Sequence, residues 1–109
     1  MVEVEVIAGV CGFKTRIRVE EKGRYKATCI IETKCPNHKK VAKILETEQI
    51  NVMDELFKKG ESQVLKACQG NIPHVSCPVP AGILKALEVG TGLALPGDAK
   101  ITFISTNNR

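Results

Sequence analysis

The chain has 109 residues and a formal net charge of +4 at pH 7, with 43% hydrophobic and 26% charged residues. This balance is typical of one soluble domain, 1–109, and the absence of a long apolar run excludes a membrane span. Aromatic residues make up only 4% of the chain, which argues against a nucleic-acid partner despite the mildly basic charge. The first residues have neither the basic nor the apolar segment of a signal peptide, so we expect a cytoplasmic protein.

Alternating residues predict three strands in the first third of the chain. Apolar side chains fall on one face over residues 2–10, and the same period of two continues over 13–20 and 24–33. Cys11-Gly12 predicts a break between the first two strands, and Glu21-Lys22-Gly23 predicts a hairpin turn between the next two. These strands should therefore pair in chain order, each antiparallel to the one before.

Helical spacing replaces the alternation after residue 35. Pro36 suits the first turn of a helix, because its missing N–H needs no partner there. Two short helices are predicted over 52–59 and 62–69, and a fourth from near Val79 to Gly90. The fourth is apolar almost all round and should be the most buried. The N-caps expected for the two short helices are Asn51 and Ser62.

The last predicted element is a strand over residues 99–105, with Ile101 and Phe103 facing the core. The order is then β-β-β-α-α-α-α-β. We predict an α+β fold, a two-layer sandwich of a mixed four-stranded sheet with helices on one face.

Five cysteines are present, an odd number that argues against a fully paired disulfide framework. Cys29 alternates with core residues of the third strand and is predicted to pack as a small hydrophobic side chain. The other four lie near the ends of elements. They converge at one edge of the sheet if the last strand runs parallel to the third. These four residues are Cys11, Cys35, Cys68 and Cys77.

A metal site is the first hypothesis for these cysteines. Four thiolates are a ligand set for zinc or for an iron–sulfur cluster. The spacing is unusual for such a site, because the chain contains no C-x-x-C pair. The predicted ligands are Cys11, Cys35, Cys68 and Cys77, with His38 and His74 as alternatives.

Thiol chemistry is the second hypothesis. Cys77 precedes a predicted helix, whose free N–H groups and dipole favour a thiolate and lower its pKa. His74 lies three residues before Cys77 and would act as its base, with Cys68 or Cys35 as the resolving thiol. The third hypothesis is a structural or interaction domain with buried cysteines or a disulfide. The sequence names no reaction, so whether the protein is an enzyme stays open.

The open face of the sheet is predicted to carry Ile7, Ile30 and Ile104. An apolar patch of this kind suits contact between two copies of the chain, so a homodimer is the expected partnership. No other protein partner can be identified from the sequence.

Several segments resemble a family of small uncharacterised prokaryotic proteins. The shared pattern is C-G-F near the start, here Cys11-Gly12-Phe13, and C-P-V-P near the end, here Cys77-Pro78-Val79-Pro80. It continues through Leu87-Glu88-Val89 to Leu93-Ala94-Leu95-Pro96, so the resemblance covers nearly the whole chain. It implies a compact cytoplasmic domain with cysteines at positions 11, 35, 68 and 77, and it carries no established activity.

Overall fold

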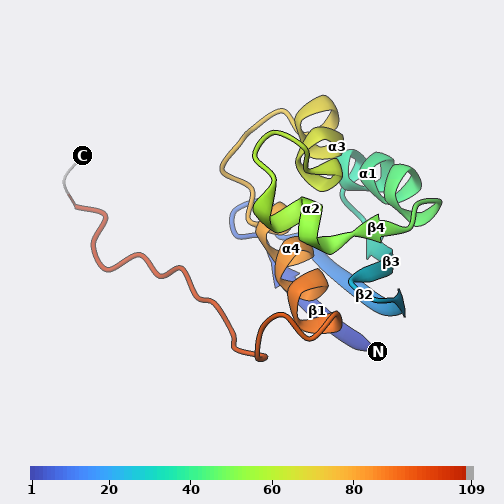
Figure 1. Ribbon diagram of the computed structural model, residues 1–109. Helices are drawn as coiled ribbons and strands as arrows, with labels where there is room; N and C mark the ends of the chain where they lie inside the picture. Colours follow the sequence, from blue (N-terminus) through green and yellow to red (C-terminus); the bar gives the residue numbers. More distant parts are fainter. Residues whose placement is uncertain (108–109) are drawn as a thin grey trace.

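The computed structural model describes residues 1–107, so the last two residues of the predicted domain, 108 and 109, lie outside it. One sheet has the strand order β1-β2-β3-β4, and each pairing is antiparallel. Four helices cover one face of this sheet (Figure 1). The elements are β1 (Val2–Ile7), β2 (Lys14–Gly23), β3 (Lys26–Thr33), α1 (Pro36–Glu46), β4 (Ile50–Asn51), α2 (Val52–Phe57), α3 (Gln63–Asn71) and α4 (Val79–Gly90).

The period of two along the strands separates a buried face from an exposed one. On β2, Thr15, Ile17 and Val19 are fully buried under the helices. Val4 of β1 and Ile31 of β3 lie opposite Ile17 and extend the core sideways. Burying a side chain of this size stabilises the fold by about 1.5–3 kcal/mol, which is why alternation predicts these strands well.

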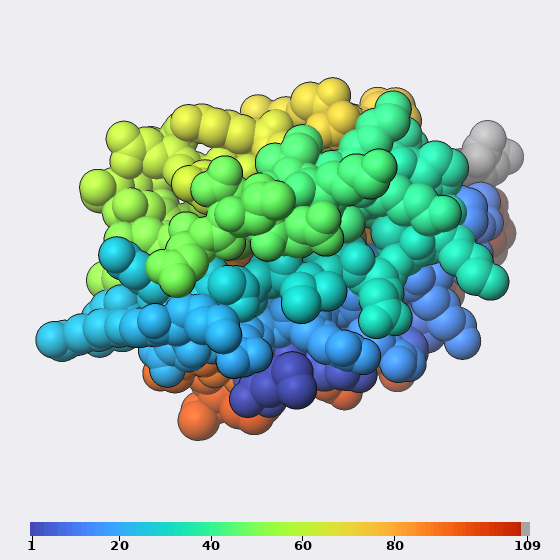
Figure 2. All heavy atoms as spheres, turned by 90° about the vertical axis from the view of Figure 1, so that its right-hand side faces the viewer, coloured from blue at the N-terminus to red at the C-terminus, as the bar shows by residue number. Residues whose placement is uncertain are grey.

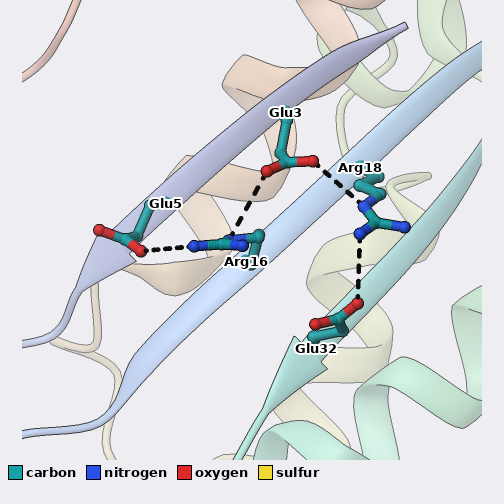
Figure 3. Close-up of polar contacts among 5 residues, drawn as sticks. All are labelled: Glu3, Glu5, Arg16, Arg18 and Glu32. Atoms are coloured by element: carbon teal, nitrogen blue, oxygen red, sulfur yellow. Dashed lines mark hydrogen bonds and ion pairs between the residues drawn. The ribbon is translucent and has the colours of Figure 1, made fainter.

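The exposed face of the sheet carries a row of ion pairs (Figure 3). Arg16 on β2 lies 3.3 Å from Glu5 and 3.6 Å from Glu3, both on β1. Arg18 lies 3.1 Å from Glu3 and 3.6 Å from Glu32 of β3. Exposed pairs of this kind contribute about 0–1 kcal/mol each, so they bias strand register more than they stabilise the fold.

Two glycines let α4 lie close to the sheet. A Cβ at Gly90 would lie 2.5 Å from Val19 Cγ1, and one at Gly82 would overlap Cγ2 of Val6. Gly82 therefore sits over the end of β1 and Gly90 over its beginning, beside Val2. Since α4 runs against β1 in this way, its first residues lie at the edge where β1 ends.

The α+β class, the single four-stranded sheet and the helices on one face are confirmed. The predicted mixed sheet and element order are wrong, because the fourth strand is Ile50–Asn51, which follows α1 and pairs antiparallel with β3, and residues 99–105 form no strand. The sheet is therefore antiparallel throughout. The alternation in residues 99–105 indicates a preference for extended backbone, but a strand forms only where the edge of a sheet is available to pair with it. Residues 95–107 instead form an exposed extended segment, the C-terminal tail, which runs away from the body (Figure 1).

The turn between β2 and β3 also lies later than predicted. Arg24 and Tyr25 connect the strands, and Gly23 pairs with Lys26. Tyr25 has a positive φ of 59°, and its carbonyl accepts a 2.8 Å hydrogen bond from Val52 N–H at the start of α2. The segment around residues 20–25, light blue in Figure 2, projects from the body.

A buried carboxylate fixes the start of α3. The hydroxyl of Ser62, the predicted N-cap, donates to Glu55 of α2 and accepts a 3.0 Å hydrogen bond from Leu65 N–H. The same carboxylate accepts a 2.7 Å hydrogen bond from Gln63 N–H, so it satisfies donors that the helix start leaves free. This contact was not foreseen from the sequence. Among residues 1–107, no helix combines the length and the apolar character that crossing a bilayer requires.

Candidate functional site

A pocket of about 110 Å³ lies at the end of the sheet that contains the last residues of β1 and β3 and the first residues of β2. Three thiols line it, from Cys11, Cys35 and Cys77, together with the imidazoles of His38 and His74. Apolar side chains complete the lining, among them Phe13, Ile72 and Val79. The pocket thus gathers most of the chain's cysteine and histidine side chains into one small and largely apolar space.

Each of these side chains is placed by the end of an element. Cys11 lies in the loop between β1 and β2, which Gly9 and Gly12 fold tightly with φ values of 101° and 74°. Cys35 is the N-cap of α1, and Cys77 comes just before α4. Cys77 reaches this edge because α4 runs against β1, so the predicted direction of the last strand was not needed for the convergence.

Cys77 and His38 are in direct contact. The Sγ atom of Cys77 lies 3.2 Å from Nε2 of His38, although 39 residues separate them in the chain. The backbone N–H of Val79, in the first turn of α4, also favours the charged form of this thiol and acts to lower its pKa. His38 is only 2% exposed, and its Nδ1 atom has no hydrogen-bond partner in the part of the chain that the structure describes. The imidazole of His38 is therefore shielded from solvent, whereas Cys77 is only half-buried.

The surroundings favour the neutral forms of both groups. Burial raises the pKa of the Cys77 thiol; Val79 N–H opposes this, and the neighbouring Cys11 and Cys35 add to it. Burial lowers the pKa of His38, and the charge of His74 lowers it further. The predicted lowering of the Cys77 pKa by the helix start is therefore wrong in direction, because desolvation outweighs the one N–H donor.

The four-cysteine metal site is wrong. Within residues 1–107, no group of three or more His, Cys, Asp or Glu side chains has the arrangement needed to hold a metal ion. Cys68 explains part of this result, because it is buried in α3 and does not line the pocket. The predicted cofactor, zinc or an iron–sulfur cluster, thereby loses the site on which it rested.

The disulfide and resolving-thiol hypotheses also fail, because no two of the five cysteines lie within disulfide-bonding distance. His74 lines the pocket but is exposed, and the hydrogen-bonded partner of Cys77 is His38. Cys29 is fully buried in the core, as predicted, and burial raises the pKa of its thiol to about 12. Burial likewise raises the pKa of Cys68 to about 11, so both of these thiols are inert in the folded protein.

His38 was foreseen as an alternative metal ligand but not as the partner of Cys77. The signal that could have found it is helical spacing, because His38, Val41 and Leu45 fall at i, i+3 and i+7 on the buried face of α1. A histidine on a buried helix face beside a cysteine at the helix start points toward the same edge as that cysteine.

Comparison with known proteins identifies the family and nothing closer. No curated protein matches the chain, and no solved structure does. The family match takes in the pocket, α4 and the first part of the C-terminal tail. The chain belongs to a family of unknown function, DUF6951, whose model matches residues 2–103.

Proposed function

We propose that the pocket is a reactive-thiol site, in which Cys77 attacks a small electrophile and His38 accepts the thiol proton. The observation that carries this proposal is the 3.2 Å contact between Cys77 Sγ and His38 Nε2 inside the pocket. A nucleophile within hydrogen-bond reach of a base is the arrangement that covalent catalysis requires. This role differs from the sequence-based thiol hypothesis in its base and in having no resolving cysteine.

The resting pair is a neutral thiol and a neutral imidazole. In the reaction, the Sγ–H proton moves to Nε2 as Sγ forms a bond to the electrophilic carbon. The leaving group departs with its bonding electron pair, or the electrons move onto the carbonyl oxygen when no group leaves. The backbone N–H of Val79 lowers the pKa of this thiol and so favours the negative charge that develops on the sulfur.

The size and lining of the pocket limit the electrophile. A volume of about 110 Å³ corresponds to roughly three or four water molecules. Phe13, Ile72 and Val79 make the space mostly apolar. A short acyl or other small carbonyl compound fits these constraints better than a charged or bulky substrate does.

The test is the rate at which iodoacetamide alkylates each cysteine, followed by peptide mass spectrometry at neutral pH. In His38→Asn, the rate at Cys77 should fall by about tenfold or more, since assistance by a general base contributes about 10²–10⁴ in favourable sites. His74→Asn is the matched control, because it removes the pocket's other imidazole and should leave the Cys77 rate nearly unchanged. Cys11 is exposed and supplies an internal reference for reagent activity.

An equal Cys77 rate in the wild-type protein and in His38→Asn would contradict the proposal. Unfolding cannot imitate the expected result, because Cys29 and Cys68 are buried and become labelled when the variant loses its core. The result therefore counts only in samples where these two thiols stay unlabelled.

The proposal also includes the compartment. Five free cysteines stay reduced in the cytoplasm, where glutathione and thioredoxin oppose disulfide formation. We therefore place the reactive thiol in that compartment, in line with the expectation from the sequence.

A further inference from the structure

The C-terminal tail is an extended, β-forming segment without a partner in its own body. Its residues 99–105 contain no proline or glycine and are rich in β-branched and aromatic side chains. Ile101 and Phe103 are each 83% exposed, and Ile104 is 98% exposed. Burying a side chain of this kind is favourable by about 1.5–3 kcal/mol, so packing the tail against another surface would be strongly favourable. The family match extends to residue 103 and so includes Ile101 and Phe103.

The sheet has an unpaired edge at β1. Among the described residues, β1 pairs with β2 alone, so its outer side leaves backbone N–H and C=O groups free. The core beneath it is also incompletely covered. Val2, Val4 and Val6 are half-buried, whereas Ile17 and Val19 of the neighbouring strand are fully buried. One more strand beside β1, with apolar residues facing the helices, would complete this side of the core.

The tail matches this edge when it is set parallel to β1. With Lys100 beside Glu3, Ile101 comes beside Val4 and Phe103 beside Val6, which extends the apolar face. On the opposite face, Ile104 comes beside Ile7, which is 64% exposed. Two arginines and three glutamates form the ion-pair row of Figure 3, a net charge of −1 for those five side chains, and Lys100 would neutralise it.

In Figure 1 the tail leaves the body after α4 and runs away from its own β1. Residues 91–98 link α4 to residues 99–105, and exchange of an identical element between copies is a low-cost route to a dimer. We propose that residues 99–105 of one copy add as a fifth strand to β1 of a second copy, and that the exchange is reciprocal. The partner is thus a second copy of this chain in a two-fold symmetric dimer.

The test is the mass of the full chain by light scattering after size exclusion, with loading from about 1 μM to about 1 mM to span weak and moderate Kd values. We expect a dimer of 23.8 kDa, twice the chain mass of 11.9 kDa. Phe103→Asp should return the mass to that of the monomer. Leu95→Asp is the matched control, because Leu95 is equally exposed in the tail but lies outside the pairing segment, and this variant should stay dimeric.

Amide hydrogen exchange gives a second readout. Residues 99–105 should exchange slowly in the dimer and fast in Phe103→Asp. A monomeric wild-type protein at the highest concentration would overturn the proposal, including the case in which the tail is protected by folding back on its own β1. A dimer that persists in Phe103→Asp would also overturn it, because the contact would then lie elsewhere.

Discussion

Gly82→Ala should destabilise the protein, although alanine is the better helix former. Gly82 is the fourth residue of α4, and an added Cβ would overlap Cγ2 of Val6 on β1. Alanine gains about 1 kcal/mol over glycine in a helix. Forcing an extra methyl group into a packed site costs about 1–3 kcal/mol. The overlap is with a branched side chain held on a strand. We therefore expect the packing cost to exceed the gain in helix propensity, so that Gly82→Ala lowers the free energy of unfolding by about 1 kcal/mol.

Gly70→Ala is the matched control. Gly70 also lies in a helix, α3, and a Cβ there would meet nothing within 4 Å. The same chemical change should then stabilise the protein by about 0.5–1 kcal/mol. The difference between the two variants isolates the packing term, because the propensity gain cancels.

Urea unfolding at equilibrium measures both effects, and thermal melting should show a shift of about 4–8 °C per kcal/mol. Combining Gly82→Ala with Val6→Ala tests the assigned clash directly. In the Val6→Ala background, Gly82→Ala should become neutral or stabilising, since its obstacle is gone. If Gly82→Ala stabilises the wild-type protein as much as Gly70→Ala does, the close approach of α4 to β1 is refuted.

Further predictions concern the buried polar groups and the loop beside the pocket. Glu55→Gln should lower the free energy of unfolding in urea by about 1–3 kcal/mol, because it removes the charged acceptor at the start of α3. Gly12→Ala should cost about 1 kcal/mol in thermal melts, since φ is +74° there, and Gly12→Asn should cost less. The lowered pKa of His38 means that the unfolded chain binds its proton more readily. Stability should therefore decline as the pH falls below about 6.5 through the lowered folded value, and urea midpoints in His38→Asn should lack this contribution. Burial raises the pKa of Cys29 to about 12, so mass spectrometry should find it alkylated in urea but not in the native protein.

Elements that bury a regular stripe were predictable from the sequence. The first three strands and all four helices follow from periods of two and 3.6, because each repeats its apolar residues over several positions. β4 has only two residues, Ile50 and Asn51, which is too short for any period to register. The segment 99–105 has the right period, but alternation carries no information about whether a partner edge is within reach.

The site was predictable in its location and not in its chemistry. Loop and helix-start positions brought Cys11, Cys35 and Cys77 to one edge, as the order of elements indicates. Sequence spacing could not show that Cys68 turns into the core or that His38 reaches Cys77 across 39 residues. The sequence-based interpretation also gave the helix start too much weight in predicting a lowered pKa for Cys77. The burial that raises this pKa depends on how α1 and α4 pack, which the sequence does not show.

The position of α4 has a consequence for how the protein is made. It is the last helix to be synthesised, yet it covers β1 and β2, which emerge first. During translation, at about 5–20 residues per second, the β1–β2–β3 meander must wait with Ile17 and Val19 uncovered until residues 79–90 appear. The contact between Cys77 and His38 forms only when α4 docks, so the nascent chain acquires this pocket at the moment its core closes.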